Sequence, residues 1–209
     1  MAITYPLALP TVTGVQSIDL RTINSVAYSR SPFTFSGQAQ ASAGQMWGAT
    51  VTLPPMRRAQ AAVWVSWLTS LRGQFGTFLM GDPTCGVPLG TAASNAGSPV
   101  VNGGSQTGED LIIDGVPANK TGYLKAGDYI QLGTGATATL HQVLQDVNSG
   151  SGGGATITLW PHIRTAPLNN STVVVANAVG RWRLSGNESN WNIDQVSIFG
   201  ITFSAMEDV

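Results

Sequence analysis

The sequence predicts a mainly β protein, an antiparallel β-sandwich with one α-helix that carries an inserted small β-barrel domain. Short alternating or β-branched runs, separated by Ser, Gly and Asn, follow one another along most of the 209 residues, as is typical of antiparallel strands. One segment, residues 55–72, has helical periodicity instead. A stretch made almost purely of Gly, Ser, Ala, Thr and Asn, residues 86–108, divides the strands into two groups, as an exposed loop would.

The strands before the helix are predicted from short runs with alternating or β-branched residues. These runs cover residues 16–22, 26–29, 33–37 and 49–53. Their spacing favours one antiparallel sheet.

The helix is bounded by residues that suit its two ends. Pro55 fits the first helical turn, and Gly73 lies where a helix usually ends. Four residues at i, i+3, i+4 and i+7 form one apolar stripe: Trp64, Trp67, Leu68 and Leu71. We expect this stripe to face the core. A strand and turn follow at residues 75–83.

The second group of strands favours a separate barrel. Short strands are predicted at residues 111–114, 129–132, 138–146, 155–160 and 172–176. Five strands at this spacing would suit an OB-like barrel.

The end of the chain returns to the first sheet. Residues 181–184 and a long strand over 191–206 are predicted, and the in/out pattern of that strand slips near Ile198, which indicates a bulge. A long apolar strand needs a partner sheet, which the first part of the chain supplies. We therefore predict a framework of residues 1–86 and 180–209, with the barrel, residues 87–179, inserted between its two parts.

The composition narrows the classes of function. Only 10% of the residues are charged and the net charge is −1, against roughly 25% charged residues in an ordinary soluble domain. A surface so neutral suits an extracellular β-module or a subunit that is covered by copies of itself or by neighbours. Nucleic-acid binding, sequence-specific or not, has no electrostatic support. No apolar run approaches the roughly 20 residues of a membrane span, and the N-terminus lacks the features of a secretion signal. We therefore expect synthesis in a cytoplasm.

Residues that could carry chemistry do not form a recognisable motif. His141 and His162 lack a metal-binding neighbour at close spacing, and a hydrolase would need both of them together beside a carboxylate. Cys85, the single cysteine, is expected to be a passive thiol. Three aspartates, Asp110, Asp114 and Asp128, match no calcium loop. No catalytic, metal-binding or cofactor-binding residue is predicted.

The helix face opposite the apolar stripe is a candidate subunit interface. It carries small residues, namely Ala59, Ala62, Ser66 and Ser70. A solvent-facing side more often carries Glu and Lys. Arg57 and Arg58 are included in this candidate interface because Arg is favoured at protein interfaces.

A different reading would make the chain a carbohydrate-binding β-module for adhesion to a host surface. In that case Trp160, next to Pro161 in the insert, is the candidate for an exposed glycan platform.

The order of these parts resembles the distal tail proteins of long-tailed bacteriophages. The matching parts are the strand at 47–53, the helix at 54–73, the strand and turn at 75–83, the barrel insertion, and the returning strand that ends at 203–207. The resemblance implies a ring of identical subunits, commonly a hexamer, that joins the tail tube protein to the baseplate hub and to peripheral adhesion parts. It implies a place at the tail tip of the virion and brings no catalytic residue.

Overall fold

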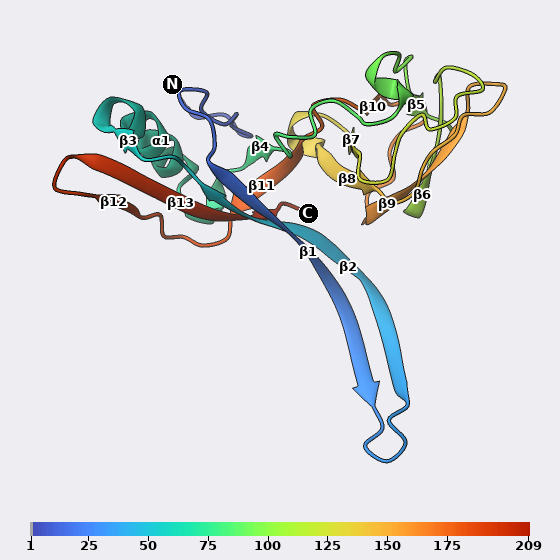
Figure 1. Ribbon diagram of the computed structural model, residues 1–209, viewed down its shortest axis with the longest axis horizontal. Helices are drawn as coiled ribbons and strands as arrows, with labels where there is room; N and C mark the ends of the chain where they lie inside the picture. Colours follow the sequence, from blue (N-terminus) through green and yellow to red (C-terminus); the bar gives the residue numbers. More distant parts are fainter. Residues whose placement is uncertain (1) are drawn as a thin grey trace.

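The computed structural model describes residues 2–209, which form a mainly β fold (Figure 1). These residues contain two antiparallel sheets and one α-helix, and the second sheet is nearly closed. The predicted fold class is confirmed.

The first sheet is built from both ends of the chain. Its strands are β1 (Ser17–Arg30), β2 (Gly37–Thr52), β3 (Met56–Arg57), β4 (Phe78–Met80), β11 (Gly180–Leu184), β12 (Trp191–Ile193) and β13 (Ile198–Glu207). Their order is β1-β2-β13-β11-β4, and both β12 and β3 pair with β13. The register of β13 on β2 runs from Thr202 opposite Thr52 to Met206 opposite Gly48.

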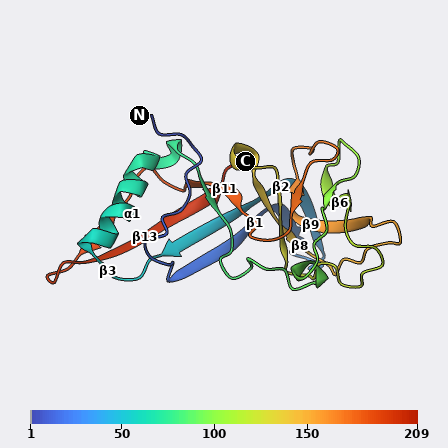
Figure 2. The same cartoon turned by 90° about the horizontal axis from the view of Figure 1, so that it is seen from above.

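Helix α1 (Arg58–Leu71) covers this sheet with the predicted apolar stripe (Figure 2). It begins later than predicted because Met56 and Arg57 pair with β13. The stripe is buried together with Ala61. Its two indole rings pack edge to face with centroids 5.7 Å apart, and the Trp67 ring lies 5.0 Å from that of Phe78. Both indole N–H groups find acceptors in the N-terminal segment, since Trp64 donates to Thr13 Oγ1 and Trp67 donates to Ala8 O.

The second sheet is nearly closed. It contains β5 (Val100–Val101), β6 (Gly108–Asp114), β7 (Tyr129–Leu132), β8 (Thr139–Val143), β9 (Ala155–Ile163) and β10 (Val173–Val174), in the order β10-β7-β8-β9-β6-β5. An antiparallel bridge between Val100 and Thr172 joins the two ends of that order. Residues 86–108 are therefore more than a loop: they supply β5 and a short 3-10 helix (Thr91–Ala93), and Val101 is fully buried in the core of the second sheet.

The two sheets share part of one hydrophobic core. Trp47 of β2 packs edge to face on Trp160 of β9 with centroids 4.5 Å apart, and its indole N–H donates to Leu140 O. Tyr129 and Leu140 of the second sheet belong to the same buried cluster as the helix stripe.

The strands β1 and β2 differ most from the prediction. They form one continuous hairpin in place of separate short strands, and residues 31–36 connect them in a turn. Beyond the sheet, residues 25–44 of this hairpin, which we call the arm, project away from the rest of the molecule (Figure 1). Every residue of the arm is exposed except Ser31, which is half-buried. The alternation of apolar and polar residues is weak in this part of the sequence because the arm contacts no core.

The end of the chain is also a hairpin. A turn over residues 194–197 separates β12 from β13, and Ser197 has a φ of 60° in this turn. Asp194 Oδ1 accepts hydrogen bonds from the N–H groups of Val196 and Ile198. The slip near Ile198 that predicted a bulge in one long strand results from this turn.

Candidate functional site

The arm has one apolar and one polar face. In the strand register Val26 lies opposite Ala41 and Tyr28 lies opposite Ala39. Because side chains alternate along a strand, these four share one face. The other face carries Ala27 opposite Gln40 and Ser29 opposite Gln38. Val26 is 54% and Tyr28 is 65% exposed.

At the root of the arm, one side of the hairpin packs against the core. There, Leu20 lies opposite Ala49 and Thr22 lies opposite Trp47. Ala49 and Trp47 are buried in the core. Between this buried part and the arm lie the polar pair Asn24 and Gln45 and a shift in register before Val26.

The arm also has free edges. Within the described residues, β1 pairs with β2 alone, and β2 pairs with β13 only from Gly48 onward. The N–H and C=O groups on the outer edges of the arm therefore lack a strand partner. Unpaired edges of this kind are templates for pairing with another chain.

The root of the arm is fixed to both sheets by polar contacts, which we call the root clamp. Arg164 Nη2 donates to Gln45 O and to Glu207 Oε2, and Glu207 Oε2 also accepts from the Trp47 N–H. The His162 N–H donates to Gln45 Oε1. The clamp holds the direction of the arm relative to the second sheet.

Glu207 is the buried charge of this clamp. Its burial raises the pKa of the carboxyl, and the Arg164 charge and the Trp47 N–H oppose that shift. The second carboxylate oxygen, Oε1, is buried and has no hydrogen-bond partner within residues 2–209.

The predicted helix interface is largely exposed. Arg57, at the end of β3, and the four helix residues Arg58, Ala59, Ala62 and Ser66 are exposed. Ser70 is half-buried because its carbonyl oxygen accepts from Tyr5 and its hydroxyl donates to Trp67 O. The described part of the chain therefore leaves most of this face uncovered.

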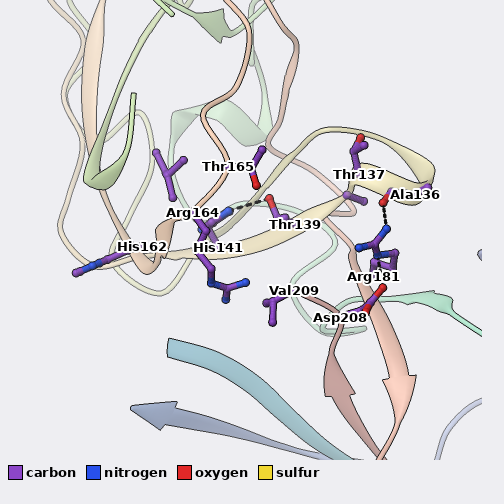
Figure 3. Close-up of a pocket in the computed structure, with 12 residues that line it drawn as sticks. Ala136, Thr137, Thr139, His141, His162, Arg164, Thr165, Arg181, Asp208 and Val209 are labelled. Atoms are coloured by element: carbon purple, nitrogen blue, oxygen red, sulfur yellow. Dashed lines mark hydrogen bonds and ion pairs between the residues drawn. The ribbon is translucent and has the colours of Figure 1, made fainter. Parts of the chain in front are cut away.

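The two histidines line one pocket of about 260 Å³ but do not act on a common point (Figure 3). His141 is buried, and its ring nitrogens lie 2.7 Å from Pro161 O and 2.9 Å from Thr139 Oγ1. The His162 ring is turned away from His141 and lies 3.7 Å from Glu109. The His141 nitrogens are thus both occupied, and the arrangement does not form the pair that a hydrolase would need.

Charged groups around this pocket pair with one another. Arg181 Nε lies 2.6 Å from Asp208 Oδ2, and Arg183 also contacts that carboxylate. No anion-binding cluster of free guanidinium groups results from this pairing.

The prediction of an exposed platform at Trp160 is wrong. Trp160 is only 9% exposed, because its ring packs on Trp47 and its indole N–H donates to Asn24 Oδ1. The other aromatic side chains of residues 87–179, Tyr123 and Tyr129, are buried too, and burial raises the pKa of each phenol to about 12. The insert therefore presents no aromatic surface on which a sugar ring could stack.

The remaining candidates have structural environments. Asp128 accepts from the N–H groups of Leu89 and Lys125 in a tight turn. Cys85 is half-buried, and its burial raises the pKa of the thiol. Within residues 2–209 no group of three or more His, Cys, Asp and Glu side chains is placed to hold a metal ion.

Comparisons with known proteins add no family: no protein-family model matches the chain, and no curated protein gives a significant match. None of the described helices has the length and apolar character that crossing a bilayer takes.

The arm is the feature that the sequence did not predict. The only available signal was the combination of two alternating runs around Pro32.

Proposed function

We propose that this protein is a structural subunit of a bacteriophage tail tip, where copies of the chain form a ring between the tail tube and the baseplate hub. The observation that carries the proposal is the arm. It is a two-stranded ribbon with an apolar face and free edges, and it contacts no core of its own. A two-stranded hairpin alone is at best marginally stable in water.

A second copy of the chain is the partner that suits the arm. The arm has a single charged residue, Arg30, in residues 25–44, so association with another neutral surface meets little desolvation cost. Contacts between identical subunits are the commonest route to closed symmetric assemblies.

The outer face of α1 supports a second contact in the same assembly. Its exposed alanines allow the close approach of another element. The neighbouring Arg57 and Arg58 are exposed, and their planar guanidinium groups suit hydrogen bonds at the rim of an interface. In a ring each subunit meets two neighbours, so two separate surfaces are needed when the contacts are head-to-tail.

The test is to remove the arm and measure the mass of the native protein. Residues 25–44 are replaced by Asn-Gly, which forms a tight hairpin turn between Asn24 and Gln45, two residues that face each other in the register. We expect the full chain to be a defined oligomer and the shortened chain to be a folded monomer with a similar thermal midpoint.

The location is tested on virions. Antibody labelling followed by electron microscopy should place the protein at the tail tip. A full chain that stays monomeric at high concentration and is absent from particles overturns the proposal.

A further inference from the structure

The tip of the arm is a hydrogen-bonded turn that holds an aromatic side chain in solvent. The Ser31 hydroxyl accepts from the N–H groups of Phe33 and Thr34, and Ser31 O accepts from the Phe35 N–H. Arg30 Nε donates to Phe35 O, and its guanidinium carbon lies 5.0 Å from the centroid of the Phe35 ring. Phe33 is 91% exposed.

This turn is preorganised for docking. Its local hydrogen bonds fix the backbone before any contact forms, which lowers the conformational entropy lost on binding. Exposed aromatic and Arg side chains of this kind are enriched among the residues that dominate binding energy. The Phe33 ring and the Arg30 guanidinium would together suit a surface on which aliphatic side chains lie beside a carboxylate.

The turn between β12 and β13 offers that surface. Ile193 is 52% and Val196 is 74% exposed. Between them, Asp194 uses Oδ1 to hold the turn, while its Oδ2 makes no hydrogen bond with the described residues. Two aliphatic side chains thus flank an available carboxylate oxygen.

The two turns lie far apart on one molecule. The arm and the β12–β13 hairpin extend in different directions from the first sheet (Figure 1). The β12–β13 turn therefore faces the arm of another copy more readily than its own, and such a contact is heterologous.

We propose that the arm tip of one copy docks on the β12–β13 turn of a second copy, with Phe33 against Ile193 and Val196 and with Arg30 beside Asp194. This inference rests on the proposed function, since it names the contact through which copies associate. The two surfaces are complementary in charge, because the arm contributes one cation and the turn contributes one anion.

A competing surface lies on β6. Ile112 is 48% exposed, and Glu109 and Asp110 are nearby in the same strand. It offers a single aliphatic side chain within a strand, whereas the β12–β13 turn presents two at a protruding end. The β12–β13 turn therefore fits the tip better, and β6 supplies the matched control.

The experiment is disulfide cross-linking in the full chain with Cys85→Ser. The pair Phe33→Cys and Val196→Cys should give a ladder of linked species on mild oxidation, while each single substitution gives dimers at most. The control pair is Phe33→Cys with Ile112→Cys, which should give no ladder.

A double-mutant cycle of the two charged residues tests the same contact without a covalent bond. Asp194→Asn keeps an acceptor for the turn and removes the charge. We expect it to raise the dissociation constant of the oligomer about 5-fold, as does Arg30→Gln, and the double variant should be no weaker than either single one. Glu188→Gln, an exposed carboxylate near the same hairpin, should leave the constant unchanged.

The outcomes separate this inference from the proposed function. If the wild-type chain is an oligomer, three results overturn the docking inference alone. These are no ladder for the 33/196 pair, a ladder for the 33/112 pair, or additive effects of the two charge substitutions. A wild-type chain that is monomeric in native mass measurements overturns both.

Discussion

At the scale of single residues, His141 shows how burial sets protonation. Its ring is enclosed in the second sheet between Thr139 Oγ1 and Pro161 O. Burial lowers the pKa of this histidine from 6.5 to about 4; the Pro161 carbonyl opposes the shift and the nearby Arg164 charge adds to it. The folded protein therefore holds His141 neutral at pH values where the unfolded chain binds a proton.

This difference predicts a pH dependence of stability. Between pH 6.5 and about 4 the unfolded state binds more protons at this site, so the free energy of unfolding should fall as the pH falls, by up to roughly 3 kcal/mol. Urea unfolding at several pH values measures it. Glu207, whose raised pKa favours proton uptake by the folded state, acts in the opposite direction. Comparison with His141→Gln isolates the histidine, and an equally steep decline in that variant contradicts the prediction.

Trp67 tests the core beneath the helix. It is 8% exposed, packs on Phe78 and donates to Ala8 O. Trp67→Ala should lower the free energy of unfolding by about 3 to 5 kcal/mol. Val63→Ala, on the exposed side of the same helix, should change it by less than about 0.5 kcal/mol. An unchanged thermal midpoint for Trp67→Ala would show that the ring adds little to the core.

At the scale of elements, the outer face of α1 is predicted to be an assembly surface. Ala62→Arg places a long charged side chain on this exposed face, so it should block association and leave the monomer folded. Native mass and circular dichroism measure the two effects. Ala93→Arg, at an exposed alanine in the short 3-10 helix Thr91–Ala93, is the control. Intact oligomers of Ala62→Arg would place the interface elsewhere.

The elements that the sequence predicted well are those with a buried face. The helix stripe and the strands of the second sheet carry apolar residues at the period of their own structure, because one side of each meets the core. The arm has no such side, so its Ser, Gln and Ala residues gave only short fragments of alternation. Phe33 was assigned to a strand for the same reason, although local hydrogen bonds place it in a turn.

The candidate site, too, has residues whose environment the sequence predicted and residues whose environment it did not. The small face of α1 follows from helical periodicity, and the structure finds most of it exposed. The burial of Trp160 depends on Trp47, which lies on another sheet. A contact between residues so far apart in the chain leaves no local pattern.

At the scale of the whole molecule, the Trp47–Trp160 contact couples the two sheets. Both rings belong to the cluster that also contains the helix stripe, so we expect the wild-type chain to unfold in one cooperative transition. Trp160→Ala should separate this into two transitions in a calorimetric scan. Leu168→Ala, at a residue that is 80% exposed, should leave one. A single transition in Trp160→Ala would show that other contacts suffice to couple the sheets.

The bend of the arm has a geometric consequence for the assembly. The β1–β2 register shifts between Asn24 and Val26, and such irregularities bend and twist a hairpin. At this point a Cβ on Gly44 would lie only 3.1 Å from that of Ser25, so a residue without a side chain lets the strands approach. If the arm tip of each copy binds the next copy, this curvature fixes the rotation from one copy to the next. A rotation that divides a full circle closes a ring, and any other rotation generates an open helical fibre. The copy number of the assembly is then set by a few small residues in the bend, far from the surfaces that touch.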